Sequence, residues 1–218
     1  TENAVITPQV KAVVSHLDYF LVENVRTARR YISKLKLGKV IEELTFEVLD
    51  KNTQNTVVNT YLKPAIEGKD IGIISESGCP GVADPGALAV SLAHKLNIEV
   101  VPLVGPSSIL MALMASGFNG QSFVFHGYVP IDKKDRTAKI KSMTRDAHTG
   151  QTQIFMDTPY RNQKLLEDLI KTCDPNIRLS IAKGISGNDE EIKTKTIKEW
   201  QSVKIDLHKV PTIFSICN

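Results

Sequence analysis

Two patterns of apolar residues alternate along the chain. Short apolar runs are typical of strands, whereas apolar residues at every third or fourth position are typical of helices. Because the two patterns follow one another from end to end, they predict an α/β fold. The predicted strands are residues 19–23, 71–75, 99–104, 123–127, 152–156, 178–182, 190–196 and 211–217, and the predicted helices are residues 26–37, 87–96, 109–116, 132–145, 160–173 and a short one at Trp200.

The pattern is interrupted at Tyr128-Val129-Pro130, which has the character of a hinge, and then begins again. A chain of 218 residues is long enough for one large core or for two domains of about 100 residues each. We therefore predict two α/β domains, an N-terminal one of residues 1–127 and a C-terminal one of residues 128–218.

Two loops are rich in glycine, proline and serine. Residues 75–86 read Ser-Glu-Ser-Gly-Cys-Pro-Gly-Val-Ala-Asp-Pro-Gly, and residues 105–108 read Gly-Pro-Ser-Ser. Each lies between a predicted strand and a predicted helix, where open parallel sheets bind their ligands. Glycines allow a ligand close to the backbone, and the first amides of a helix are free to bind it. Together the loops predict a site for a ligand of nucleoside size, although either loop alone is better explained as a tight turn.

The composition excludes several classes of protein. With 42% hydrophobic and 23% charged residues, the chain is typical of a globular protein. The longest apolar runs fall short of the roughly 20 residues that span a membrane, and no signal segment opens the chain. We therefore expect a cytoplasmic protein without a membrane partner. The three cysteines and five histidines are scattered, so we expect neither a disulfide framework nor a metal site.

Motifs of several enzyme classes are missing from the sequence. It has no Walker GxxxxGK[ST], no GxGxxG after a strand, no HExxH and no GxSxG. These absences argue against phosphate-loop enzymes, ordinary dinucleotide enzymes and common hydrolases.

The formal net charge is only +3, and the positive excess lies after residue 127. The densest run is residues 132–145, in which six basic residues outnumber two aspartates between 132 and 135. A basic helix of this kind can bind phosphates. A solvated helix face has the same composition, and charge alone favours that explanation.

Four segments resemble the tetrapyrrole methylase family of S-adenosylmethionine-dependent methyltransferases. The most specific is the loop of residues 75–86, followed by residues 101–108 with Ala115-Ser116-Gly117. Residues 23–29, Glu-Asn-Val-Arg-Thr-Ala-Arg, and residues 155–161, Phe-Met-Asp-Thr-Pro-Tyr-Arg, are similar to motifs of one branch of that family. This branch methylates a ribose 2'-hydroxyl of a cytidine in small-subunit ribosomal RNA.

The resemblance implies two α/β domains with S-adenosylmethionine bound in the cleft between them, and a homodimer. It also implies a strand and a loop ahead of Thr1, so the domain of residues 1–127 is expected to lack its first strand. Carried over by position in the family's motifs, the residues that would contact S-adenosylmethionine are Ser77, Gly78, Cys79, Val82, Ser107, Ser108, Asp157 and Ile185.

Methyl transfer is an in-line displacement, for which the enzyme mainly aligns donor and acceptor. A ribose hydroxyl is a poor nucleophile that a nearby base would activate, and Asp84 and Asp157 are the candidates. Equally, Asp84 could cap the following helix and Asp157 could open a turn. The residues expected to bind RNA phosphates, as part of a ribosomal RNA or small-subunit partner, are Arg26, Arg29, Lys133, Lys134, Arg136 and Arg161.

Two other functions stay open. The first is methylation of a small tetrapyrrole, a corrin or porphyrin, against which the basic run argues. The second is a non-catalytic homologue that binds RNA or a nucleotide. This hypothesis draws on departures from the family pattern at Asn24, Tyr160 and Gly184.

Overall fold

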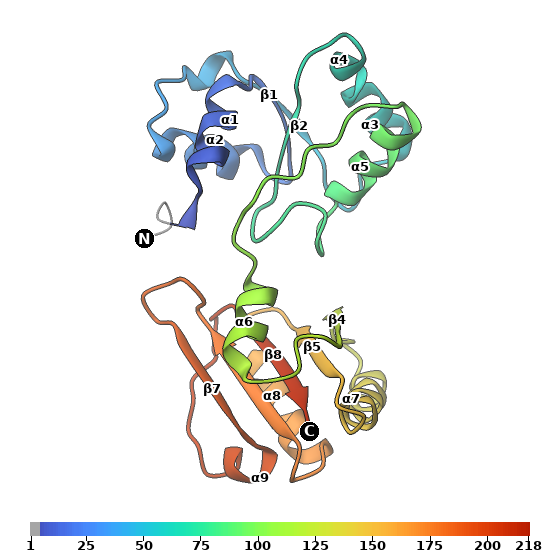
Figure 1. The fold of residues 1–218 in the computed structure, drawn as a ribbon, viewed down its shortest axis with the longest axis vertical. Coiled ribbons are helices and arrows are strands. Elements are labelled where there is room, and N and C mark those ends of the chain that lie inside the picture. Colours follow the sequence, from blue (N-terminus) through green and yellow to red (C-terminus); the bar gives the residue numbers. More distant parts are fainter. Residues whose placement is uncertain (1–4) are drawn as a thin grey trace. The chain divides into compact units, whose positions relative to one another are not determined.

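The computed structural model describes residues 5–218, which form two compact units (Figure 1). The N-terminal unit extends to Pro106 and the C-terminal unit comprises Ser107–Asn218. The division therefore lies before the segment Tyr128-Val129-Pro130, not at it. The physical reason is that the elements between 107 and 128 pack within the sheet and core of the C-terminal unit.

A parallel three-stranded sheet forms the centre of the N-terminal unit. Its strands are β1 (Tyr19–Val22), β2 (Thr45–Val48) and β3 (Gly72–Ile74), in the order β2-β1-β3. In the middle strand β1, Phe20, Leu21 and Val22 are all buried. This continuous apolar run is what a parallel strand covered on both faces requires.

Helices cover both faces of this sheet. Phe20 and Val22 belong to one core, with α1 (Pro8–His16) and α2 (Val25–Leu35), whereas Leu21 belongs to a second core with α3 (Asn55–Tyr61) and α5 (Gly86–Lys95). Because successive strand residues point to opposite faces, one strand serves both cores. The short helix α4 (Lys63–Ile66) and a 3-10 turn, η2 (Ile41–Glu43), complete the unit.

One predicted strand of the N-terminal unit is wrong. Residues 99–104 form no strand in the structure. Val101 and Val104 are 66% and 71% exposed, Val100 packs against the second core, and the Val104 carbonyl accepts a 3.3 Å hydrogen bond from Thr7 Oγ1. An extended apolar segment needs a neighbouring strand to satisfy its amides, and the described residues supply none here.

The C-terminal unit contains a mixed sheet of five strands in the order β4-β5-β8-β6-β7. β4 and β5 are parallel, whereas β8 is antiparallel to both β5 and β6, and β7 is antiparallel to β6. The strands are β4 (Phe123–Tyr128), β5 (Thr152–Met156), β6 (Arg178–Lys183), β7 (Glu191–Thr196) and β8 (Thr212–Cys217).

Helices also divide between the two faces of this second sheet. α6 (Ser108–Ser116) packs on one face, in a small core with Ile154, Ala182 and Ile213. The larger core on the other face joins the sheet to α7 (Lys133–Ala147), α8 (Asn162–Thr172) and α9 (Ile197–Trp200). Its largest side chain, Trp200, is buried and donates a 2.8 Å hydrogen bond from Nε1 to the Leu179 carbonyl.

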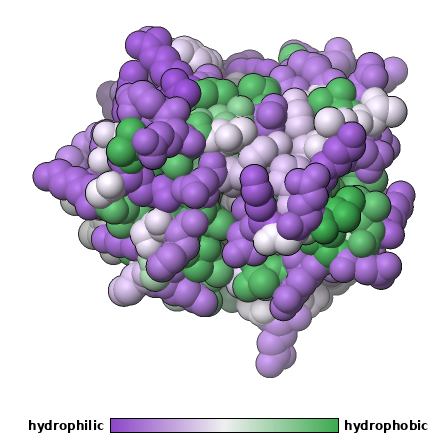
Figure 2. Space-filling model, turned by 90° about the horizontal axis from the view of Figure 1, so that it is seen from above, coloured by the Kyte–Doolittle hydropathy of each residue, from purple (hydrophilic) through white to green (hydrophobic). Residues whose placement is uncertain are grey.

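The surface is mostly polar on the face drawn in Figure 2, where hydrophobic residues form small separate patches. None of the helices in residues 5–218 combines the length and the apolar character that crossing a membrane requires.

A hydrogen-bonded histidine connects β4, β5 and α7. His126 Nε2 lies 2.7 Å from Gln153 Oε1, and Lys139 Nζ lies 2.9 Å from His126 Nδ1. Because the ammonium group of lysine can only donate, Nδ1 accepts and Nε2 carries the proton of a neutral ring. Burial, and secondarily the charge of Lys139, lower the pKa of His126, against the opposing effect of Gln153.

We expect this histidine to make the C-terminal unit less stable in acid. The folded-state pKa lies below the unfolded value, so the unfolded chain binds a proton that the folded chain resists, and the free energy of unfolding falls as the pH drops below about 6.5. Urea unfolding followed by Trp200 fluorescence at pH values of about 7.5 and 5.5 measures the loss. The variant His126→Gln should show a smaller loss than the wild type, and an equal loss would contradict the assignment.

Candidate functional site

The loop after β3 takes its shape from two glycines and one aspartate. Gly78 and Gly81 have φ angles of +80° and +79°, which glycine adopts without strain. Asp84 Oδ1 accepts hydrogen bonds from the backbone amides of Gly81 and Gly86, the latter at 2.8 Å. Gly86 is the first residue of α5, so Asp84 connects the loop to the start of that helix. This contact fits the second of its two predicted roles, that of a helix cap rather than a base.

The second loop begins beside the first. Cys79 Sγ is 3.4 Å from the carbonyl oxygen of Pro106 and can donate to it. A Cβ atom added at Gly78 or at Gly105 would meet no heavy atom within 4 Å. Both loops therefore present bare backbone with open space in front of it, which fits a ligand that hydrogen bonds to backbone groups.

The remaining residues predicted at these loops lie as follows. Ser77 is exposed, and its carbonyl accepts a 2.9 Å hydrogen bond from Ser75 Oγ. Val82 is 45% exposed. Ser107 is the N-cap of α6, where its Oγ accepts from the amide of Leu110, and Ser108 is the first residue of that helix. Ser107 and Ser108 belong to the C-terminal unit.

An open cavity of about 670 Å³ lies at the carboxyl ends of the strands of the N-terminal unit. Glu23 follows β1, Asp50 follows β2 and Glu76 follows β3, so the topology itself gathers their carboxylates there. Glu23 Oε1 accepts a 3.1 Å hydrogen bond from the amide of Glu76. The residues that line the cavity are Glu23, Asn24, Asp50, Lys51, Glu76, Ala83, Asp84 and Pro85.

The cavity is acidic, because Lys51 is the only cation among its lining residues. The backbone amide of Asn52 and the hydroxyl of Thr53 lower the pKa of Asp50, so that carboxylate is fixed in its ionised form. Within residues 5–218, His, Cys, Asp and Glu side chains are nowhere grouped closely enough to hold a metal ion. An acidic cavity of this kind is suited to hydroxyl and amino groups, which donate hydrogen bonds.

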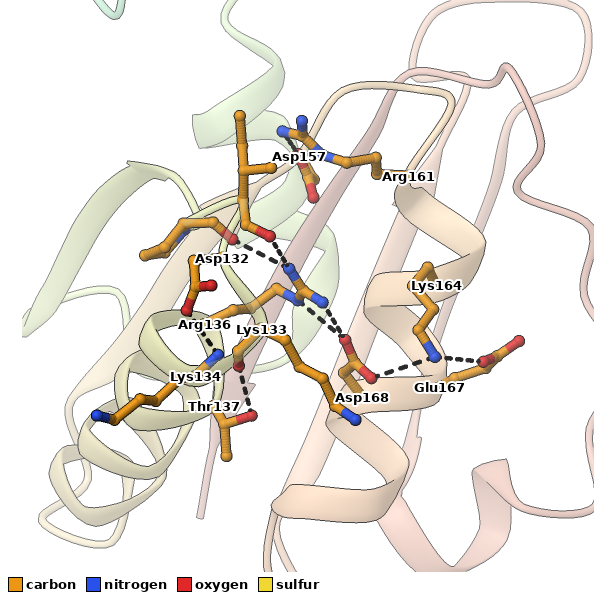
Figure 3. Close-up of polar contacts among 12 residues, drawn as sticks. Asp132, Lys133, Lys134, Arg136, Thr137, Asp157, Arg161, Lys164, Glu167 and Asp168 are labelled. Atoms are coloured by element: carbon orange, nitrogen blue, oxygen red, sulfur yellow. Dashed lines mark hydrogen bonds and ion pairs between the residues drawn. The ribbon is translucent and has the colours of Figure 1, made fainter.

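Two of the predicted site residues form one ion pair in the C-terminal unit (Figure 3). Asp157 is buried, and its Oδ1 accepts from the Thr158 amide at 2.7 Å and from Arg161 Nε at 2.8 Å, with a second contact from an Arg161 Nη. The hydrogen bond that Arg161 donates to Asp157 raises the pKa of Arg161. Ile185, predicted to contact the same ligand, packs against the small core under α6.

Arg136 does not lie where an RNA-binding residue must. It is 8% exposed, and its Nε and Nη2 contact Asp168 Oδ2 at 2.9 and 2.8 Å. Its Nη1 donates to the carbonyls of Pro130 and Ile131. Arg136 faces the core because it lies on the buried side of α7, together with Ile140 and Met143. The number of basic residues in 132–145 does not show which of them lies on that side.

The other predicted RNA-binding residues of these helices are accessible. Lys133 and Lys134 are exposed at the start of α7, and Arg26 and Arg29 are exposed on α2. The Arg29 guanidinium lies 5.5 Å from the centre of the Phe46 ring, a cation–π contact that fixes its direction.

Sequence reasoning missed most of the cavity. Glu23 and Glu76 carried a usable signal, since each stands at the end of a predicted apolar strand. Asp50 carried none, because β2 was not predicted: its residues Thr-Phe-Glu-Val are only partly apolar.

The first comparison with known proteins is a match to a family model. The model describes tetrapyrrole (corrin/porphyrin) methylases and matches residues 4–201.

Several curated relatives share one name, ribosomal RNA small subunit methyltransferase I. The protein of this name from Buchnera aphidicola is 33% identical over 155 residues, covering 70% of this chain and 53% of the relative. The one from Vibrio cholerae is 28% identical over 194 residues, covering 89% of this chain and 65% of the relative. The chain thus spans between half and two thirds of the length of these relatives.

Among solved structures, the methyltransferase CobJ is similar in fold. The two chains superpose with a TM-score of 0.65 over 99% of this chain and 89% of CobJ, at 17% sequence identity. This likeness agrees with the predicted α/β architecture of two parts.

Proposed function

Because the chain belongs to the tetrapyrrole (corrin/porphyrin) methylase family, we propose that it transfers a methyl group from S-adenosylmethionine to ribosomal RNA. The acceptor is a ribose 2'-hydroxyl of a cytidine in the small-subunit RNA. The names of the relatives support the RNA acceptor. The observation that carries the proposal is the open loop of residues 75–86 in the N-terminal unit, which has free space in front of Gly78 and lines an acidic cavity with Ala83, Asp84 and Pro85.

In this proposal, S-adenosylmethionine is held by backbone and small side chains. Ser77, Gly78, Cys79 and Val82 would bind it from the N-terminal unit, and the open space at Gly78 supports that role. S-adenosylmethionine supplies a methyl group activated by a positively charged sulfur. The residues proposed to bind it from the C-terminal unit are Ser107, Ser108, Asp157 and Ile185.

Asp84 is the better of the two proposed general bases. Two backbone amides hold its Oδ1, which fixes the direction of the carboxylate in the wall of the cavity. A base must lie within hydrogen-bond reach of the hydroxyl that it deprotonates, and the position of Asp84 in the wall of an open cavity supports this role. Asp157 is buried and paired with Arg161, so it is better suited to orient that side chain than to accept a proton.

We also propose that the protein acts in the cytoplasm as a homodimer. On α6, Leu110 and Met114 are 50% and 82% exposed. They stand four residues apart and therefore share one side of the helix. Sedimentation equilibrium of the full chain should give twice the monomer mass, and a monomer at every concentration would contradict this part of the proposal.

The experiment that tests the proposed function is methyl transfer from labelled S-adenosylmethionine to small ribosomal subunits that lack the modification. We expect label in the RNA, at one cytidine whose neighbouring bond then resists alkaline hydrolysis. Label in a corrin or porphyrin precursor, with none in RNA, would assign the tetrapyrrole function instead. Salt-dependent RNA binding with no transfer would identify a non-catalytic homologue.

A further inference from the structure

One side of α7 carries basic residues without acidic ones. At 3.6 residues per turn, Lys134, Ala138, Lys141 and Arg145 lie within about 60° of one another, and all four are exposed. We call these four residues the α7 stripe. It lies directly opposite the side of the helix that faces the core. The buried residues on that side are Arg136, Ile140, Met143, Thr144 and Ala147.

The acidic residues of α7 lie beside the stripe. Asp135 and Asp146 share one flank of the helix, about 90–110° from the centre line of the stripe. Asp146 Oδ1 is 3.4 Å from Arg145 Nε, but both side chains are well exposed, 77% for Arg145 and 41% for Asp146. Exposed pairs of this kind contribute little, so Arg145 can exchange Asp146 for another anion.

The neighbouring helix α8 shows what an ordinary solvated helix of this unit contains. There, Lys164 Nζ pairs with Glu167 at 3.1 Å and with Asp168 at 3.5 Å (Figure 3). Charges of both signs thus neutralise one another on α8, whereas Arg145 of the stripe has only its exposed contact with Asp146, and Lys134 and Lys141 form no ion pair within the described residues.

Buried contacts hold the helix that carries the stripe. Arg136 joins α7 to α8 through Asp168 and to the preceding loop through the carbonyls of Pro130 and Ile131. Figure 3 shows Arg136 directed toward α8 and the side chain of Lys134 directed away from it. The stripe therefore lies on a helix that is held in place. Binding of an anion to it does not carry the entropic cost of ordering a loop.

We propose that the α7 stripe binds the phosphodiester backbone of the RNA, an inference that rests on the proposed function. From Lys134 to Arg145 the stripe extends about 16 Å at 1.5 Å per residue, which spans several phosphates of a nucleic-acid strand. The small side chain of Ala138 between the cations leaves room for the strand. Contacts of this kind give affinity and orientation but do not select a base.

The test compares two triple variants of the full chain that lose the same charge. One is Lys134→Gln with Lys141→Gln and Arg145→Gln. The matched control is Lys171→Gln with Lys198→Gln and Lys204→Gln, three exposed lysines of the C-terminal unit away from α7. The measured quantity is binding of a small-subunit RNA hairpin by fluorescence anisotropy at several salt concentrations, together with calorimetric binding of S-adenosylmethionine.

We expect the stripe variant to bind the hairpin on the order of 100-fold more weakly near 0.1 M salt, with a salt slope shallower by about 2–3. The control should change little, and S-adenosylmethionine should bind all three proteins equally. If both variants bind RNA like the wild type while methyl transfer persists, the stripe is not the RNA surface and the proposed function stands. If the wild type neither binds RNA nor methylates subunits, both proposals fail. Loss of binding to anionic vesicles alone would assign the stripe to a membrane and overturn the inference.

Discussion

Asp84→Asn is expected to lower kcat for methyl transfer to small ribosomal subunits by about 10²–10⁴-fold, the usual contribution of a general base. Asparagine keeps an oxygen at Oδ1, so the hydrogen bonds from Gly81 and Gly86 persist and the loop keeps its shape. What the variant loses is the negative charge that accepts the proton of the ribose hydroxyl. Single-turnover kinetics with labelled S-adenosylmethionine measure the effect.

A matched control for this variant lies in the same cavity. Glu76→Gln removes one carboxylate charge from the cavity wall and should leave kcat within a few-fold of the wild type, because the Glu76 side chain is not the proposed base. Affinity for S-adenosylmethionine should be unchanged in both variants. If Asp84→Asn retains full activity, Asp84 shapes the loop only, and the base must be sought elsewhere.

Asp168→Ala is expected to lower the free energy of unfolding of the C-terminal unit by about 3–5 kcal/mol. The variant leaves the Arg136 guanidinium, with a side chain only 9% exposed, without its carboxylate partner. Arg136 keeps its hydrogen bonds to two backbone carbonyls, but these neutral acceptors do not replace a carboxylate beside a charge that has lost its hydration. Trp200, the one tryptophan of the sequence and buried in this unit, reports the transition in urea.

The double variant Arg136→Met with Asp168→Leu distinguishes loss of the ion pair from loss of packing. Two apolar side chains of similar volume should restore most of the stability, because neither leaves a charge in the core. Glu167→Ala, one position away but exposed, should cost less than about 0.5 kcal/mol. Equal destabilisation by Glu167→Ala and Asp168→Ala would contradict the importance of the buried pair.

Elements with strong apolar patterns could be predicted from the sequence. The predicted strand at residues 19–23 contains the apolar run Tyr19–Val22 that forms β1, and residues 212–217 of the last predicted strand form β8. α6 was marked at both ends, by Ser107 as N-cap and by Gly117 in the left-handed conformation after its last residue. Such signals are carried by neighbouring residues, so they can be read without knowing how the rest of the chain packs.

Elements that depend on distant partners were missed or misplaced. α3 is short and has no side-chain cap, so tertiary packing rather than local preference makes it a helix. α1 does carry local signals, with Thr7 as its N-cap and Pro8 as its first residue, and the prediction missed them. The opposite error, at residues 99–104, arose because an apolar run predicts a strand without saying whether a neighbour exists to pair with it. The division between the units was misplaced because β4 ends at a hinge-like sequence yet pairs with β5.

In the same way, some residues discussed for the candidate site could be identified from local sequence, whereas their distant partners could not. Asp84 could be singled out because its loop is unusual in sequence, and the structure gives that loop a defined geometry. That Arg136 faces the core follows from the period of α7, since it stands four residues before Ile140, which is also buried. Its partner Asp168 lies on another helix, and no local pattern could reveal the pair.

Binding of S-adenosylmethionine to the full chain can be measured directly by calorimetric titration. We expect one site per chain with a Kd of about 1 μM, near −8 kcal/mol, and weaker binding to Gly78→Val, since valine at a φ of +80° strains the loop. Absence of binding to the wild type would show that the protein is not an S-adenosylmethionine-dependent methyltransferase, because the two loops would then have kept their shape without binding the methyl donor.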